Sequence, residues 1–132
     1  MKEKYIQSLM FWPGEHPCIA YLLDDPIFLN FAVGLGSALG GSTEILQLSD
    51  TAAIIYNCEG LLSDLKGNRK VGRKLLAGVF YVVGIKDGEL TDLPTEEMEK
   101  YFDQFWEPEH YTEADVKDAW KHEFLGVLSD LD

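Results

Sequence analysis

Cysteine is scarce in this chain, with only Cys18 and Cys58 among 132 residues. A disulfide scaffold is therefore excluded, because 46% of the residues are hydrophobic and a chain of this length buries a core without covalent staples. We expect two unpaired, partly buried thiols in a reducing compartment. This usage favours a cytoplasmic protein.

Long apolar runs are also lacking. A membrane-spanning helix needs about 20 consecutive apolar residues, and Gly, Asn and acidic residues interrupt every candidate stretch. The first residues, MKEKYIQSLMFW, carry mixed charge and pass directly into an alternating pattern, unlike a secretory signal. We expect no membrane span.

Positive charge is almost absent from the last third of the chain. Residues 1–86 hold eight acids and eight Lys or Arg, whereas residues 87–132 hold fifteen acids against Lys100, Lys117 and Lys121. The formal charge of -12 therefore lies entirely after residue 86. Such a protein is repelled by phosphate backbones, so direct nucleic-acid binding is disfavoured and a basic protein partner is favoured.

The first half of the chain predicts two hairpins around a helix. Residues 4–11 and 16–23 read as strands joined by a turn at Trp12–Glu15, and residues 44–48 and 52–58 as a second pair. Asp24 or Asp25, followed by Pro26, predicts a helix start. The helix should run to Leu39 and pack on the sheet, because apolar residues recur every four positions at Ile27, Phe31, Leu35 and Leu39.

The second half predicts one long strand and two acidic helices. Residues 59–74 read as a glycine-rich connection, and residues 75–85, LLAGVFYVVGI, as a single buried central strand. A helix should begin at Pro94 or Thr95 and bury Met98, Tyr101, Phe102, Phe105 and Trp106. After a break at Glu107–Pro108, Thr112 and Asp115 predict a capping box. The last helix would align Val116, Trp120, Phe124, Val127 and Leu131 along one side.

These elements predict an α+β fold. We expect an antiparallel or mixed sheet of about five strands, packed by the apolar helix and by one or two acidic C-terminal helices. Residues 1–106 should form a single domain, and residues 107–132 a helical extension packed on it. Whether the last helix packs within the chain or between chains stays open, as does the oligomeric state.

Four segments resemble a known family. They are residues 54–60, IIYNCEG; the loop Gly67-Asn68-Arg69; residues 77–84, AGVFYVVG; and residues 93–101, which open the acidic helix. Their order and spacing resemble the domain of unknown function 3846 family, best over residues 43–106. The resemblance implies an accessory protein of a phage or mobile element in a bacterial host, with no established activity.

The acidic helices form the leading candidate site. Carboxylates held on rigid helices can occupy a basic cleft built for phosphates, and the family context favours a host defence enzyme as the target. We therefore expect a non-enzymatic inhibitor of the anti-restriction or anti-CRISPR type, although a merely solubilising surface is the plain alternative. The predicted partner-binding residues are Glu96, Glu97, Glu99, Asp103, Glu107, Glu109, Glu113, Asp115 and Asp118.

A basic loop is the alternative site. Five of the eleven Lys and Arg residues lie between positions 66 and 74, and they could hold an anionic ligand or nucleic acid. The same loop could instead dock on the acidic helices or stay solvated. Asn68 and Arg69 could also be structural, with Asn68 in a tight turn and Arg69 reaching a backbone carbonyl or a carboxylate. The residues of this alternative are Lys66, Asn68, Arg69, Lys70, Arg73 and Lys74.

No motif predicts catalysis, a cofactor or a metal. Gly34 and Gly36 lie within an apolar helical pattern rather than between a strand and a helix, unlike a dinucleotide fingerprint. Asp115, Asp118 and His122 share a face of the last helix, but one helix seldom encloses a metal alone. We expect no enzyme activity.

Overall fold

The computed structural model describes the backbone of residues 3–35, 37, 41–61 and 65–130, and side chains up to residue 123. The strands and helices form an α+β arrangement, as predicted. Their order is β1 (Tyr5–Phe11), β2 (Cys18–Leu23), α1 (Pro26–Val33), β3 (Thr43–Gln47), β4 (Ala52–Asn57), β5 (Gly67–Val71), β6 (Lys74–Ala77), β7 (Phe80–Lys86), β8 (Glu89–Thr91), α2 (Thr95–Gln104) and α3 (Glu113–Asp130).

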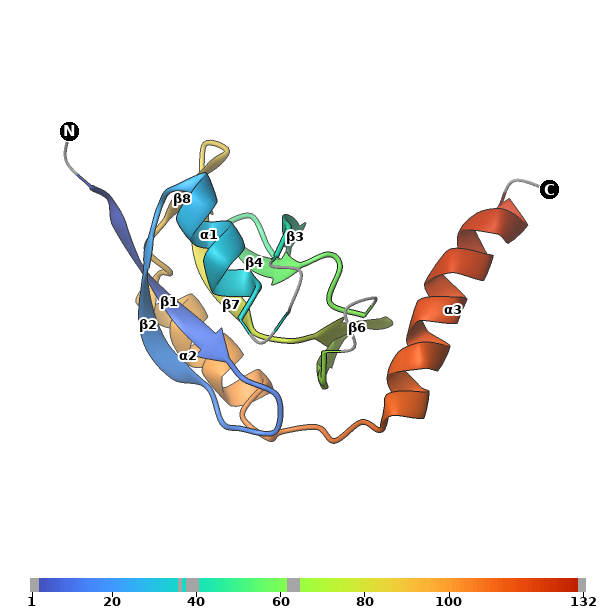
Figure 1. Ribbon diagram of the computed structural model, residues 1–132. Helices are drawn as coiled ribbons and strands as arrows, with labels where there is room; N and C mark the ends of the chain where they lie inside the picture. The colour runs from blue at the N-terminus through green and yellow to red at the C-terminus, as the bar shows by residue number, and fades with distance from the viewer. Residues whose placement is uncertain (1–2, 36, 38–40, 62–64, 131–132) are drawn as a thin grey trace.

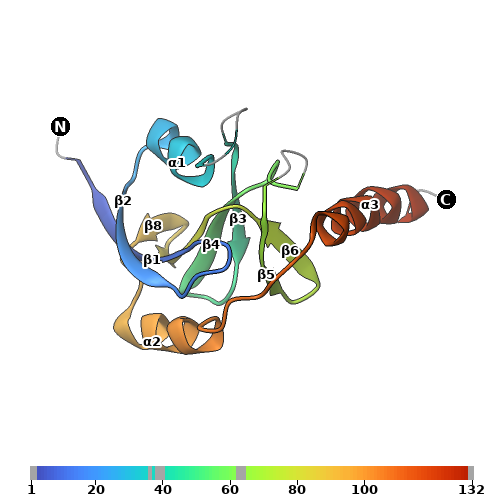
Figure 2. The ribbon, with the colours of Figure 1, turned by 60° about the horizontal axis from the view of Figure 1, so that its bottom comes forward.

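The main sheet is antiparallel, with strand order β2-β1-β7-β4-β3 and with β8 paired to β7. Strands β5 and β6 form a separate hairpin. Helix α1 covers one face of the sheet and α2 covers the other, while α3 stands beside the hairpin, away from both (Figures 1 and 2). The acidic helices therefore lie in different parts of the molecule.

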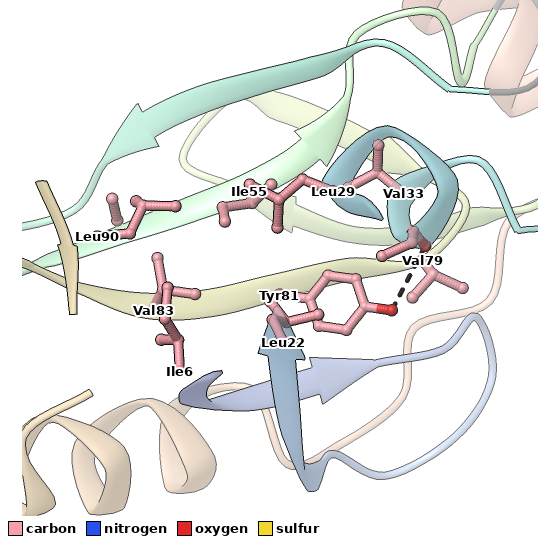
Figure 3. Close-up of a cluster of buried hydrophobic side chains, with 11 residues drawn as sticks. Ile6, Leu22, Leu29, Val33, Ile55, Val79, Tyr81, Val83 and Leu90 are labelled. Carbon is pink, nitrogen blue, oxygen red and sulfur yellow. Dashed lines mark hydrogen bonds between the residues drawn. The ribbon is translucent and has the colours of Figure 1, made fainter. Parts of the chain in front are cut away.

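Two apolar clusters fill the space between the sheet and these helices. Successive residues of a strand point to opposite faces, so the sheet contributes to both clusters. On the α1 side Tyr81 lies in the cluster of Figure 3, where its hydroxyl donates to the Ala32 carbonyl at 3.4 Å. Burial raises the pKa of Tyr81 to about 12. On the α2 side Phe11 stacks on Phe80, with ring centroids 4.7 Å apart.

The prediction of one strand over residues 75–85 is wrong. The chain turns at Gly78, whose φ of +82° belongs to the left-handed region that favours glycine, and a Cβ there would lie 2.7 Å from Leu65 Cδ1. Residues before the turn belong to β6 and residues after it to β7. Apolarity on both sides of the turn concealed the break. A further strand, β8, follows the tight turn at Asp87 and Gly88.

Helix α1 starts as predicted but faces differently. Asp25 Oδ1 accepts from the backbone N–H groups of Ile27 and Phe28, both at 3.0 Å. The predicted burial of Ile27 and Phe31 is wrong, because they are 81% and 66% exposed. Leu29, Ala32 and Val33 face the sheet instead, and the helix ends at Val33. Leu39 lies outside the described residues.

Helix α3 begins with the predicted capping box. The Thr112 N–H donates to Asp115 Oδ2 at 2.8 Å, and the Asp115 N–H donates to Thr112 Oγ1 at 3.1 Å. Val116 is buried, whereas the Phe124 and Val127 side chains and Leu131 lie outside the described part.

Both thiols are free, but they are exposed rather than partly buried. Among the described helices none combines the length and apolarity needed to cross a bilayer.

Candidate functional site

Helix α2 presents an acidic outer face on a firmly anchored inner face. Tyr101 and, at the helix end, Phe105 are buried in the core under the sheet, because the apolar residues recur at helical spacing. The opposite side exposes Glu96, Glu99 and Asp103. These carboxylates therefore occupy fixed positions rather than a loose tail.

No internal cation neutralises this face within the described chain. The ion pairs formed there are Lys4–Asp24 at 3.8 Å and Lys74–Glu123 at 3.3 Å, and neither involves α2. Lys100, the one basic residue of α2, lies 5.2 Å from the Tyr101 ring centroid. We define the acidic face of α2 as Glu96, Glu99 and Asp103.

Glu97 belongs to the structure of the domain rather than to this face. Its Oε1 accepts a hydrogen bond from Thr51 Oγ1 at 3.0 Å, and Ser49 Oγ lies 3.5 Å from each oxygen. Both partners lie in the turn between β3 and β4. Glu97 thus ties the start of α2 to the sheet.

Of the predicted acids beyond α2, some face solvent and others contact the hairpin. Glu109 accepts from the Lys70 N–H at 3.0 Å and from the Tyr111 hydroxyl. Burial, followed by this bond to Glu109, raises the pKa of Tyr111 to about 12. Glu107 and Glu113 are exposed. The nine predicted carboxylates are therefore not one continuous array.

Asp115 and Asp118 lie on the part of α3 that borders the basic hairpin. The pKa of Asp115 lies below its ordinary value of 3.8, first because of the Thr112 N–H and hydroxyl hydrogen bonds, with a further contribution from the Lys70 charge. Asp118 lines the same cleft as Lys70 and Arg73. These acids serve α3 and its contact with the hairpin.

Apart from Lys66, which immediately precedes β5, the residues of the alternative site lie on β5, β6 and their turn rather than in a loop. Lys66, Lys70 and Arg73 are exposed. Lys74 pairs with Glu123 and lies 5.2 Å from the Tyr56 ring centroid. The hairpin therefore docks in part on an acidic helix, which was the plain alternative for this segment.

Asn68 and Arg69 are fully buried and unavailable to a surface ligand. The Arg69 guanidinium donates from Nε to the Phe105 carbonyl at 2.8 Å, from one terminal nitrogen to the Glu15 carbonyl at 2.7 Å and from the other to Asn68 Oδ1 at 2.8 Å. Asn68 Nδ2 donates to the carbonyls of Phe11, at 2.9 Å, and Gly78, at 2.8 Å. We call this pair the Asn68–Arg69 joint.

The joint fastens the hairpin to the main domain. Its partners come from the end of β1, the turn after it, the bend between β6 and β7, and the end of α2. The guanidinium also lies 5.2 Å from the Phe11 ring centroid. Burial lowers the pKa of Arg69, opposed by the charge of Glu109, yet an arginine remains charged at physiological pH.

Two polar clefts flank the linker to α3. One, of about 430 Å³, lies between the β1–β2 turn and residues 109–116. The other, of about 530 Å³, lies between the hairpin and α3. Lys70 and Arg73 enter the second cleft together with the carboxylates Asp115, Asp118 and Glu123. Acids outnumber cations there, which weakens the alternative of an anion-binding site.

Histidines also meet at this cleft, since His110 and His122 both line it. The described side chains nevertheless include no group of three or more His, Cys, Asp or Glu residues arranged to hold a metal ion. Asp115, Asp118 and His122 are no exception.

A third groove, of about 400 Å³, was not anticipated from the sequence. It runs between β2 and α2 and is lined by Leu9, Ile19, Met98, Glu99, Phe102 and Asp103. Beside it Tyr5, Ile19 and Tyr21 are 57%, 53% and 65% exposed. The apolar run at residues 16–23 predicted the strand, but not that β2 would lie at a sheet edge with this face uncovered.

The chain was compared with family models, curated proteins and solved structures. Residues 8–106 match the family model described as Domain of unknown function (DUF3846), a longer span than the resemblance over residues 43–106. No match was found among the curated proteins or among the solved structures. Because the matched residues make up most of the chain, this protein belongs to the domain of unknown function 3846 family.

Proposed function

We propose that this protein is a non-enzymatic binding protein whose acidic face of α2 occupies a basic cleft of a nucleic-acid-handling protein. The observation on which the proposal depends is that Glu96, Glu99 and Asp103 are exposed on an anchored helix and have no internal ion pair in the described chain. Unpaired, fixed carboxylates bind cations without first breaking internal pairs.

The partner class follows from charge. A cleft that normally holds a phosphate backbone is lined by Lys and Arg, which also bind carboxylates. Within this class we propose a host defence enzyme as the target, so that the protein acts as an inhibitor of the anti-restriction or anti-CRISPR type. The resemblance to phage and mobile-element accessory proteins supports this choice.

The structure narrows the proposed surface relative to the sequence prediction. Glu97, Glu109 and Asp115 make hydrogen bonds within the chain, so we place them outside the binding face. Glu107 is exposed just beyond the end of α2.

The test is affinity capture from a bacterial lysate with identification of the bound proteins, using the native chain and two variants of equal charge. The first variant changes Glu96→Gln, Glu99→Gln and Asp103→Asn. The second changes Glu44→Gln, Glu59→Gln and Glu89→Gln, which are exposed acids away from α2.

The native chain and the second variant should both retain a nucleic-acid-handling protein. The first variant should bind that protein at least about 30-fold more weakly. Raising salt from about 50 mM to about 500 mM should release the partner, because the attraction is screened. Equal capture by both variants, or a partner insensitive to salt, would contradict the proposal.

A further inference from the structure

Strand β2 is an open sheet edge. It pairs with β1 on one side only and has no charged residue over Cys18–Leu23. It stands at the end of the strand order, and Figure 2 shows it on the side of the molecule away from α3. An uncharged edge strand without a covering element is a template for pairing with another chain.

The pairing register shows which backbone groups are open. The Asp24 N–H donates to the Lys4 carbonyl at 2.8 Å, so Lys4 and Asp24 are a hydrogen-bonded pair. Hydrogen-bonded pairs recur at every second residue of an antiparallel ladder, and Cys18, Ala20 and Leu22 therefore point their N–H groups at β1. Ile19 and Tyr21 point their backbone N–H and C=O groups outward, where no described residue forms a hydrogen bond with them.

The opposite edge of the sheet is better protected. On β3 the outward N–H of Thr43 donates to Asn30 Oδ1 at 3.0 Å, and the Thr43 hydroxyl donates to the same oxygen at 2.6 Å. Glu44 adds an exposed charge to that strand. Charged side chains and covering elements discourage pairing at an edge. Among the strands that the structure describes, β2 alone thus combines an uncharged sequence with open backbone groups.

The groove beside β2 indicates what the pairing segment would contain. Ile19, Met98 and Phe102 give it an apolar wall, and Glu99 and Asp103, one helical turn apart, stand at its acidic side. An arginine or lysine fits this chemistry, because its aliphatic stem packs on apolar surface while its charged end reaches carboxylates. A purely apolar strand would leave both carboxylates unpaired.

We infer that the basic partner adds an extended strand to the outer edge of β2, with alternate Arg or Lys side chains directed to the groove between β2 and α2. Backbone bonds to Ile19 and Tyr21 would supply the pairing, and Glu99 and Asp103 the selection for cations. This inference rests on the proposed function, since it names the element that the partner of α2 would present.

The test uses synthetic peptides as probes of the full chain. The first probe is acetyl-Thr-Arg-Val-Arg-Val-Arg-Thr-amide, which as a strand places its arginines on one face. The second has the same sequence with N-methyl groups along the backbone, which keep the charge and remove the N–H donors. The third replaces arginine by citrulline, which keeps the shape and removes the charge.

Binding is measured by NMR titration of the amides of the chain. The first probe should shift the Ile19, Tyr21, Glu99 and Asp103 amides and slow hydrogen exchange at Ile19 and Tyr21. The N-methylated probe should bind at least about tenfold more weakly than the first probe, because it lacks the backbone hydrogen bonds. The citrulline probe should bind several-fold more weakly, because it lacks the charge.

A variant provides an independent check. Tyr21→Pro removes an N–H that points away from β1, so the sheet keeps its own hydrogen bonds. The variant should weaken binding of the first probe as strongly as N-methylation of the probe does. Should the variant fail to fold, the N-methylated probe alone decides the question, because it leaves the protein unchanged.

Three outcomes would overturn the inference. The first is equal binding of the native and N-methylated probes, and the second is shifts confined to residues away from β2 and α2. The third is a dimer of the chain that Tyr21→Pro dissociates, since a second copy would then occupy the edge. The proposed function fails separately, through equal lysate capture by the two charge variants.

Discussion

The two acidic helices of this protein differ in what their carboxylates contact. On α2, Glu96, Glu99 and Asp103 face solvent without an internal cation in the described chain. On α3, Glu123 pairs with Lys74, and Asp115 and Asp118 line a cleft with Lys70 and Arg73. Sequence alone makes the two helices look equivalent, since both are rich in acids and poor in Lys and Arg.

The difference teaches that position relative to the β5–β6 hairpin, rather than acid content, separates a binding face from a structural contact. The hairpin holds the largest group of cations and lies beside α3 (Figure 1). The Asn68–Arg69 joint fixes it there. Four predictions test this comparison, from the largest expected effect to the smallest.

Arg69→Met should break the joint between the two regions. It removes a buried charge together with the donors for the Phe105 and Glu15 carbonyls and for Asn68 Oδ1. We expect a loss of about 3–5 kcal/mol in the free energy of unfolding, measured in urea. Arg73→Met, an exposed hairpin residue, is the control and should change stability by no more than about 0.5 kcal/mol. Similar losses in the free energy of unfolding for the two variants would show that the Asn68–Arg69 joint does not stabilise the domain.

Removing the hairpin cations should lower the local stability of α3, because its carboxylates then lose their cation partners. Lys70→Gln with Lys74→Gln deletes the Glu123 ion pair and a charge beside Asp115. We expect amide exchange over residues 113–123 to accelerate about five- to thirtyfold, a change of about 1–2 kcal/mol in local stability. Lys4→Gln with Lys86→Gln alters net charge equally and should leave α3 unchanged. The same acceleration in both variants would show that α3 does not depend on the hairpin.

The Tyr111 hydroxyl should titrate late. Its pKa is raised from 10 to about 12, so the contribution of the neutral phenol is fully present below pH 10 and is lost as pH rises through about 12. Ultraviolet titration should show phenols that ionise well above pH 10 in the native chain, and one fewer of them in Tyr111→Phe. That variant should lose about 1 kcal/mol of stability at neutral pH. A Tyr111 phenol that titrates at its ordinary value would contradict the contact with Glu109.

Asp115 should titrate early. Its pKa lies below 3.8 because of the Thr112 cap and then Lys70, so its contribution to α3 is present above pH 3.8 and is lost as pH falls through the lower folded value. NMR titration of the carboxyl group should give a midpoint under 3.8. In Thr112→Val the midpoint should rise toward that value, whereas in Ser49→Ala, distant from α3, it should not. An unchanged midpoint in Thr112→Val would exclude the Thr112 hydroxyl as a cause and would leave the backbone N–H bond, which valine keeps, as the source of the lowered pKa.

Local features of the fold were predictable from the sequence. The Asp25 cap with Pro26, the Thr112–Asp115 capping box and the short hairpin turns depend on residues a few positions apart, and the structure has each of them. The helical spacing of Tyr101 and Phe105 likewise predicted the buried side of α2.

Long-range features were not predictable in the same way. The structural alternative for Arg69, a bond to a backbone carbonyl, is confirmed, but its full burial and its partners Glu15 and Phe105, far along the chain, were not predictable. The bend at Gly78 divides two runs that are both apolar, and apolarity alone does not reveal it. Helix α1 is uncharged, so its sequence pattern did not distinguish the side that packs on the sheet from the side that exposes Ile27 and Phe31.

The decisive measurement is hydrogen exchange over the whole chain, with and without the captured partner. Binding through α2 and β2 should slow exchange over residues 18–23 and 95–104 and leave residues 67–77 and 113–123 unchanged. Slower exchange confined to the hairpin and α3, with α2 unaffected, would show that the acidic face of α2 is not the binding surface.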